Sequence, residues 1–276
     1  AEGIVLIRQR TKINEELLSK LPNLKIISAT GANYAGHIDV EACSKYRVAV
    51  AAGGSGTRST CELAWGLILS HMRSIPKEVS NLKNGGWQST LGEDLSGKTL
   101  GIYAYGKIGR QMGQIAKAFN MDVLIWGRVS SREKAKEDGF IFADNKDFFF
   151  SNSDIITIHL PLKKETKGII TLDELSLMKK NSLFVNTSRA KIIQSGDLEK
   201  ALIQGRPGFA CIDVYEEEPI YHSENDLIQM NNTTCTPHLG YVTRETYEKY
   251  FGLAFDQINA FCDGKPINLA NPEVLK

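Results

Sequence analysis

The sequence predicts an α/β protein with two parallel β-sheets. Short apolar runs alternate with longer segments whose apolar residues recur at the spacing of a helix turn. A strand covered on both faces reads as a continuous apolar run, and strands that alternate with helices form parallel sheets. Two such series follow one another, separated by a glycine-rich stretch. We therefore expect two sheets in two domains.

The first series has short apolar runs, which we expect to be strands, and one clear helical pattern. Asn14 precedes that pattern, where an asparagine side chain can accept a hydrogen bond from a free N–H group at the helix start. The expected strands are residues 4–7, 24–29 and 48–52, and the expected helix is residues 14–20. The run Gly-Gly-Ser-Gly at 53–56 ends the series and indicates a domain boundary.

The second series opens with a helical pattern in which Leu63, Leu67 and Ile68 share one face. After a loop rich in turn residues, strands and helices alternate from Thr99 onward. The expected strands are residues 100–104, 123–126, 155–160, 183–186 and 208–213. The expected helices are residues 57–72, 109–119, 171–178 and 195–204, followed by a last amphipathic helix at 243–262. Repeated units of this kind predict a doubly wound sheet.

These series predict the domain organisation. Residues 57–241 form one doubly wound domain, and residues 1–56 with 242–276 form a second, discontinuous domain to which the last helix returns. A strand-like run begins almost directly after Ala1. We therefore expect the second domain to lack the N-terminal start of its fold.

Composition argues against several classes of partner. Lys and Arg number 33 against 32 Asp and Glu, so the net charge of +1 predicts no surface for nucleic acid. No apolar run approaches the roughly 20 residues of a membrane helix, and no HExxH or clustered Cys and His spacing indicates a metal site. The five cysteines are scattered, which is typical of reduced thiols. We expect a cytoplasmic protein.

A glycine-rich loop joins the strand at 100–104 to the next helix. It reads Ala104-x-Gly106-x-x-Gly109, close to the GxGxxG fingerprint of dinucleotide sites. Gly106 would let a pyrophosphate approach the helix N-terminus, and Gly109 would let helix and strand pack closely. An ordinary strand–helix turn is the alternative. The flanking strand and helix, and the ~20 residues to the end of the next strand, favour a Rossmann cofactor domain.

The end of that next strand bears on the choice of cofactor. NAD sites usually place a carboxylate there, on the adenosine ribose, whereas this chain has Gly127 followed by Arg128. An arginine at this point can pair with the 2′-phosphate of NADP. The alternative is a solvated loop arginine. We expect a nicotinamide cofactor, NAD(P), with NADP slightly favoured over NAD.

Candidate catalytic groups lie in segments 186–190, 213–219 and 236–240, where an open α/β sheet places its ligands. Reduction of a keto acid needs a cation for the carboxylate and carbonyl, and the planar fork of Arg189 suits that task. It also needs an acid for the developing alkoxide, and His238 is the natural donor. A neighbouring carboxylate, such as Glu218, would orient the imidazole and favour its charged form. Singly, each residue is more simply a surface or loop residue.

In these motifs the chain resembles the D-isomer-specific 2-hydroxyacid dehydrogenase family. The matching segments, in the family's order, are 36–39 (GHID), 57–59 (TRS), 95–102 (LSGKTLGI), 159–162 (HLPL), 185–189 (VNTSR), 213–214 (DV), 218–219 (EP) and 236–240 (TPHLG). The resemblance implies hydride transfer between a nicotinamide cofactor and a small D-2-hydroxy or 2-keto acid. The substrate would belong to the phosphoglycerate, glycerate, glyoxylate or hydroxypyruvate class. It also implies a homodimer joined through the cofactor domain.

The resemblance assigns roles to particular residues. It implies that Arg189 binds and polarises the substrate, that His238 is the acid or base, and that Glu218 orients His238. It places Asn33 and Tyr34 at the substrate carboxylate. With the loop residues above, the expected cofactor-binding set is Ala104, Gly106, Lys107, Ile108, Gly109, Arg128, His159, Pro161, Thr187, Asp213 and Gly240.

Departures from the family pattern leave alternatives open. Ala104 replaces the first fingerprint glycine, Gly127 replaces the usual acidic residue, and Tyr34 stands where a glycine is common. The residues that follow Arg189 also differ. These changes keep a second hypothesis in view, a cofactor-sensing regulatory protein without turnover. A formate dehydrogenase is a third, disfavoured because that group usually carries Gln where Glu218 stands.

Overall fold

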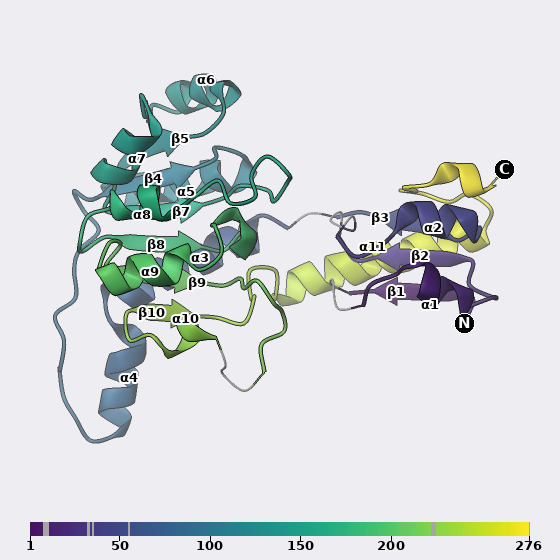
Figure 1. Ribbon diagram of the computed structural model, residues 1–276, viewed down its shortest axis with the longest axis horizontal. Helices are drawn as coiled ribbons and strands as arrows, with labels where there is room; N and C mark the ends of the chain where they lie inside the picture. Colours follow the sequence, from purple (N-terminus) through teal and green to yellow (C-terminus); the bar gives the residue numbers. More distant parts are fainter. Residues whose placement is uncertain (8–10, 32–33, 35, 55, 222–224, 276) are drawn as a thin grey trace. The chain divides into compact units, whose positions relative to one another are not determined.

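The computed structural model describes residues 1–7, 11–31, 34, 36–54, 56–221 and 225–275. The chain forms two compact units, one from residues 1–56 with 241–276 and the other from residues 57–240 (Figure 1). No helix within these described stretches is both long and apolar enough to cross a membrane.

The smaller unit contains a parallel three-stranded sheet in the order β1-β2-β3. Asn14 accepts a hydrogen bond from the backbone N–H of Leu17 at 3.1 Å, which confirms the predicted cap of α1. Helix α11 packs on the same sheet, where the hydroxyl of Ser28 donates to the carbonyl of Ala254 at 2.9 Å. The elements are β1 (Gly3–Leu6), α1 (Glu15–Ser19), β2 (Ile26–Ala29), α2 (Val40–Lys45), β3 (Ala49–Ala52), α11 (Arg244–Cys262) and η2 (Pro272–Leu275).

The larger unit contains a parallel seven-stranded sheet in the order β10-β9-β8-β7-β4-β5-β6. Its strands are β4 (Thr99–Tyr103), β5 (Asp122–Trp126), β6 (Ile141–Phe142), β7 (Ile155–Ile158), β8 (Leu183–Asn186), β9 (Phe209–Ile212) and β10 (Thr233–Cys235). Its helices are α3 (Arg58–Met72), α4 (Ile75–Lys83), α5 (Lys107–Ala118), α6 (Val129–Glu137), α7 (Lys146–Asn152), α8 (Leu172–Ser176), η1 (Ala190–Ile192), α9 (Asp197–Gln204) and α10 (Asp226–Gln229). The order reverses between β4 and β7, as in a Rossmann sheet.

Apolar side chains cover both faces of this larger sheet. Val123 and Ile125 of β5 join a cluster with α3 and α5, whereas Leu124 between them joins a cluster on the other face with α7, α8 and α9. Alternate residues of a strand point to opposite faces, so a continuous apolar run is what a doubly covered strand requires. The α/β prediction and the doubly wound cofactor fold are therefore confirmed.

Several short elements were not predicted from the sequence, among them α2, α4, α6, α10, β6 and β10. For α7 the sequence indicates helix core at Phe148-Phe149-Phe150 but not the bounds of the helix. Its run Phe148-Phe149-Phe150 lacks helical spacing of apolar and polar residues, yet Phe149 and Phe150 are buried while Phe148 is exposed. Asn145 caps this helix by accepting a hydrogen bond from the N–H of Phe148 at 2.7 Å. Two turns bury too few residues to generate a periodic pattern.

Candidate functional site

Parallel strands end at the same edge of a sheet, and the larger unit carries its candidate residues at that edge. The loops that follow β4, β5, β7, β8, β9 and β10 all leave the sheet there, and we call this the carboxyl edge. Open α/β sheets bind ligands at this edge, next to the point where the strand order reverses.

The loop after β4 makes a tight turn into α5. Ala104 has φ +78°, in the left-handed region that disfavours a side chain. A Cβ atom on Gly109 would lie 2.4 Å from the carbonyl oxygen of Ala104, so only glycine fits at residue 109. A Cβ atom on Gly106 would meet nothing within 4 Å, so the space beside the helix N-terminus is open.

The N-terminus of α5 has the properties of an anion site. Gly106 is the N-cap and supplies no side-chain acceptor, and the first turn contains no acidic residue. The first backbone N–H groups therefore lack the usual side-chain partners, and the helix dipole adds positive potential. Lys107 is exposed at the first position of the helix, while Ile108 packs partly against the apolar core. These features fit the pyrophosphate of a dinucleotide.

Arg128 lies just beyond the end of β5, as expected. It is the N-cap of α6 and is exposed. Within the described part of the chain, its guanidinium has no hydrogen-bonded or ionic partner. Gly127, which precedes it, lies against the turn at Ala104, and a Cβ atom there would be 3.4 Å from the Cα of Ala104.

The ends of β7 and β8 place further expected cofactor residues at the carboxyl edge. His159 lies 3.0 Å from the hydroxyl of Thr157 through Nε2, and burial lowers the pKa of His159 to about 3, so its ring is neutral. The carbonyl of Pro161 accepts a hydrogen bond from the hydroxyl of Thr166 at 2.6 Å. Thr187 is only 5% exposed, and its Oγ1 has no partner among the described residues. A buried hydroxyl without a partner fits a polar group of a bound ligand.

Asp213, at the end of β9, holds the loop that carries His238. Its carboxylate accepts hydrogen bonds from Thr236 Oγ1 at 2.6 Å and from the N–H groups of Leu239 at 2.7 Å and Gly240 at 2.9 Å. Burial raises the pKa of Asp213, although these donors oppose the shift. The carbonyl of Gly240 accepts a hydrogen bond from Thr60 Oγ1 at 2.8 Å.

The structure brings His238 and Glu218 together. His238 Nδ1 lies 2.5 Å from Glu218 Oε2, and Glu218 Oε1 accepts a hydrogen bond from the N–H of Tyr215 at 2.9 Å. An ionised carboxylate only accepts hydrogen bonds, so Nδ1 is the donor to Glu218. His238 has φ +56°, a strained conformation for a residue with a side chain.

Arg189 follows β8, the strand next to β9. Its carbonyl accepts a hydrogen bond from Asn186 Nδ2 at 3.1 Å, and its own Nη1 donates to the carbonyl of Ser188 at 2.7 Å. The N–H of Asp213 donates to the carbonyl of Asn186 at 3.0 Å. The segment with Arg189 and the segment that holds the His238 loop therefore begin at the ends of adjacent strands.

The remaining expected substrate residues belong to the smaller unit. Asn33 lies outside the described residues. Tyr34 is half-buried against the core of the three-stranded sheet, and its carbonyl accepts hydrogen bonds from the N–H groups of His37 and Ile38, both at 3.0 Å. The roles of Asn33 and Tyr34 toward a substrate stay predictions.

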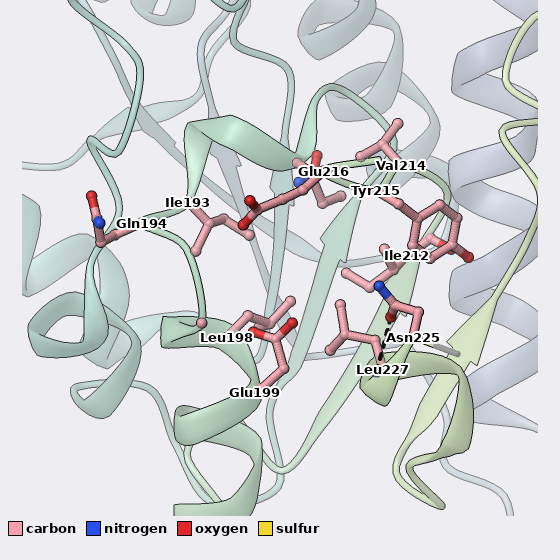
Figure 2. Close-up of a pocket in the computed structure, with 13 residues that line it drawn as sticks. Ile193, Gln194, Leu198, Glu199, Ile212, Val214, Tyr215, Glu216, Asn225 and Leu227 are labelled. Carbon is pink, nitrogen blue, oxygen red and sulfur yellow. Dashed lines mark hydrogen bonds between the residues drawn. The ribbon is translucent and has the colours of Figure 1, made fainter. Parts of the chain in front are cut away.

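A pocket that the sequence did not indicate lies beside the ends of β8 and β9 (Figure 2). Ile193, Leu198 and Leu227 form its apolar wall, and Glu199 and Glu216 add carboxylates. These residues come from separate segments without a shared motif, so no sequence signal could have revealed the pocket. Neither Arg189 nor His238 lines it. No group of three or more His, Cys, Asp or Glu side chains able to hold a metal ion occurs in the described part of the chain.

Comparison with known proteins places this geometry in context. Residues 65–240 match the family model of the D-isomer specific 2-hydroxyacid dehydrogenase, NAD binding domain. Glyoxylate reductase of Aeropyrum pernix is 37% identical, with 96% of this chain and 82% of that protein covered. The solved phosphoglycerate oxidoreductase of Vibrio cholerae O395 is 44% identical, with a TM-score of 0.91, 95% of this chain and 84% of that chain covered. D-lactate dehydrogenase of Aquifex aeolicus, solved with NAD and lactic acid, is 28% identical, with a TM-score of 0.82. The match covers 98% of this chain and 86% of that chain.

Proposed function

The chain belongs to the D-isomer specific 2-hydroxyacid dehydrogenase family, and we propose that Arg189, Glu218 and His238 are the residues that carry its reaction. Members of this family are oxidoreductases that transfer a hydride between a nicotinamide cofactor and a small 2-hydroxy or 2-keto acid, and this chain is one of them. The alternative of a regulatory protein without turnover is not supported, because the relatives are named reductases and dehydrogenases.

The contact between His238 and Glu218 is the observation that carries the proposal. With Nδ1 committed to the carboxylate, Nε2 of a charged imidazole holds the proton that a developing alkoxide needs. In the oxidising direction, Nε2 of the neutral ring accepts the hydroxyl proton. Glu218 orients the ring, and the N–H of Tyr215 holds Glu218 in place.

Arg189 would meet the substrate carboxylate and polarise its carbonyl. A guanidinium offers two parallel N–H donors that match a carboxylate, and its charge stabilises negative charge that develops on the carbonyl oxygen. The contact of Nη1 with the carbonyl of Ser188 fixes one side of the fork. We assign Asn33 and Tyr34 to the same carboxylate as a prediction from the family resemblance.

The residues at the carboxyl edge fit a nicotinamide dinucleotide. We propose that residues 57–241 hold the cofactor and that residues 1–56 with 242–276 contact the substrate. The uncapped N-terminus of α5 would hold the pyrophosphate, and Thr187 and Asp213 would face the nicotinamide end. The bound cofactor supplies or accepts the hydride. The exposed Arg128, with no carboxylate before it, supports a preference for NADP over NAD.

Two further properties are proposals. Apolar residues Ile75, Val79 and Leu82 of α4 are 45%, 48% and 59% exposed, and Trp87 beyond them is 77% exposed, which supports association into a homodimer through this unit. A cytoplasmic location is supported by the five cysteines, all of which are described and are free thiols. Analytical ultracentrifugation measures the first property directly.

A panel of 2-keto acids with NADH and NADPH in parallel tests the proposed function. Glyoxylate, hydroxypyruvate, pyruvate and 3-phosphohydroxypyruvate cover the chemical range of the family. We expect turnover with at least one acid and a higher kcat/KM with NADPH than with NADH. Replacement of Arg128 by Asp should reverse that preference. Cofactor binding without turnover on any acid would contradict the assignment of these residues.

A further inference from the structure

We propose that Tyr215 is a positioning residue for the catalytic pair, acting through the hydrogen bond of its phenol group to the turn that presents His238. This inference rests on the proposed roles of His238 and Glu218. Tyr215 is not among the residues that the motifs or the comparisons assign to the site. It follows β9 directly after Asp213 and Val214, and it contacts the segments of both members of the pair.

The contacts of Tyr215 run in two directions. Its backbone N–H donates to Glu218 Oε1 at 2.9 Å, and its hydroxyl donates to the carbonyl oxygen of Thr236 at 3.0 Å. Figure 2 shows the ring at the side of the pocket, with the hydroxyl directed away from Glu199. A single residue therefore connects the carboxylate, through its backbone, to the turn that carries the imidazole, through its phenol.

The carbonyl of Thr236 is the critical atom. It also accepts the backbone N–H of His238 at 2.9 Å, closing a tight turn across Pro237. Tyr215 and His238 thus share one acceptor, so the phenol contacts the peptide group that sets the direction of the imidazole. Because burial raises the pKa of Tyr215, its hydroxyl stays protonated and remains a donor throughout the working pH range.

The strained backbone at His238 explains why this turn needs support. A residue with a side chain at φ +56° persists only where surrounding contacts hold it. Asp213 holds one side of the turn through Thr236 Oγ1 and the N–H of Leu239. The Tyr215 hydroxyl holds the other side of the turn through the carbonyl oxygen of Thr236. Without it, the turn can relax and Nε2 of His238 departs from the line of proton transfer.

The test replaces Tyr215 by Phe, which removes only the hydroxyl. We expect kcat for keto acid reduction to fall about 10-fold, because a small misplacement of a catalytic group lowers the rate steeply. The KM for the keto acid and the Kd for the cofactor should change less than twofold, because the phenol contacts neither. Tyr103→Phe is the matched control, since Tyr103 is buried beside Phe149 and Phe150. That variant should keep kcat.

A double-mutant cycle separates positioning from general stability. If Tyr215 acts through His238, then Tyr215→Phe adds nothing to the loss already caused by His238→Ala. Unchanged kcat in folded Tyr215→Phe, or a full additional loss in the double variant, overturns the inference. Full turnover in His238→Ala would contradict the proposed function itself. Wild-type behaviour of Tyr215→Phe, with a large loss in His238→Ala, would contradict only the positioning role of Tyr215. Thermal melting of both phenylalanine variants verifies that each is folded.

Discussion

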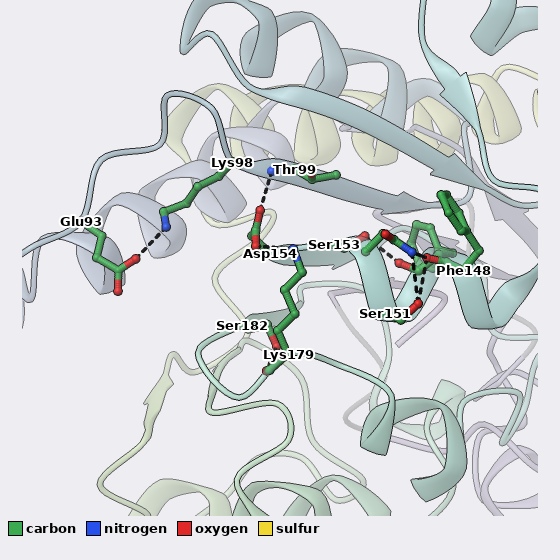
Figure 3. Close-up of polar contacts among 11 residues, drawn as sticks. Glu93, Lys98, Thr99, Phe148, Ser151, Ser153, Asp154, Lys179 and Ser182 are labelled. Carbon is green, nitrogen blue, oxygen red and sulfur yellow. Dashed lines mark hydrogen bonds and ion pairs between the residues drawn. The ribbon is translucent and has the colours of Figure 1, made fainter.

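The two edges of the seven-stranded sheet differ in how well their polar groups are satisfied. At the amino edge, where the strands begin, Asp154 accepts hydrogen bonds from the N–H of Thr99 at 2.8 Å and from Lys179 Nζ at 2.6 Å (Figure 3). Lys98 pairs with Glu93 at 2.7 Å nearby. At the carboxyl edge, by contrast, Thr187 Oγ1 has no partner in the described structure.

Backbone strain divides the edges in the same way. In the loops that lead directly into the strands, positive φ angles fall on Gly97, with φ +76°, Gly139, Gly205 and Asn120, with φ +55°, and glycine and asparagine tolerate this conformation. In the loops that leave the strands, positive φ angles include Ala104 and His238, whose side chains make the conformation costlier. The loops that lead into the strands thus carry tolerated backbone, whereas the loops that leave the strands hold strained residues and an unsatisfied hydroxyl, as binding and catalytic sites do.

Histidines at the two edges give the largest expected contrast. His238→Ala should lower kcat by at least about 10²-fold, and up to about 10⁴-fold, because it removes the proton donor while leaving the cofactor residues in place. His71→Ala is the control, since His71 packs against Phe209 at the start of β9, with ring centroids 4.7 Å apart and the planes tilted. It should keep turnover and lose only stability. Steady-state kinetics with cofactor titration distinguishes the two, and unchanged turnover in His238→Ala would remove that residue from the mechanism.

Arginines give the second contrast. Arg189→Lys should lower kcat/KM for the keto acid by on the order of 10²-fold, because an ammonium cannot reproduce the two parallel donors that stabilise the developing charge. Arg206→Lys tests the amino edge, where Arg206 Nη1 donates to the carbonyl of Met178 at 3.1 Å. Equal losses in the two variants would mean that the guanidinium of Arg189 has no special role toward the substrate.

The pH dependence of stability gives a smaller effect. Because the pKa of His159 is lowered to about 3, the unfolded chain binds a proton below about pH 6.5 that the folded chain does not. Stability is therefore lost as pH falls from 6.5, by about 1–2 kcal/mol at pH 5. His159→Gln should abolish this part of the loss in urea unfolding at pH 7 and 5. His71→Gln should abolish less, because Glu93 opposes the lowering of the His71 pKa by burial. Identical pH dependence in His159→Gln and the wild type would contradict the prediction.

Relief of strain gives the smallest effect. Ala104→Gly should raise the free energy of unfolding by about 0.5–1 kcal/mol, because the relief of the left-handed conformation exceeds the added entropy of the unfolded chain. Asn120→Gly at the amino edge should gain nothing, since asparagine already tolerates a positive φ. Denaturant titration of both variants measures the difference. A loss of stability in Ala104→Gly would show that the methyl group contributes more than its backbone strain costs.

Much of the fold could be predicted from the amino-acid sequence. The buried strands of the larger sheet were predicted to within a few residues, because burial on both faces demands continuous apolar runs. Helix α9 shows where prediction failed at a boundary, since Gly196 with φ +75° delays its start to Asp197. Short polar helices such as α6 were missed because they expose most of their residues and therefore leave no apolar pattern.

The candidate site divides along the same line. The sequence alone was enough to indicate the glycine loop and the motifs with Arg189, Glu218 and His238, because each is a short run of residues with its own chemistry. Only the tertiary structure showed that Glu218 reaches His238, that Asp213 holds its loop, and that Tyr215 joins the two. Those contacts join residues about twenty positions apart, through loops whose paths depend on the whole sheet. Neither spacing nor composition encodes where such loops meet.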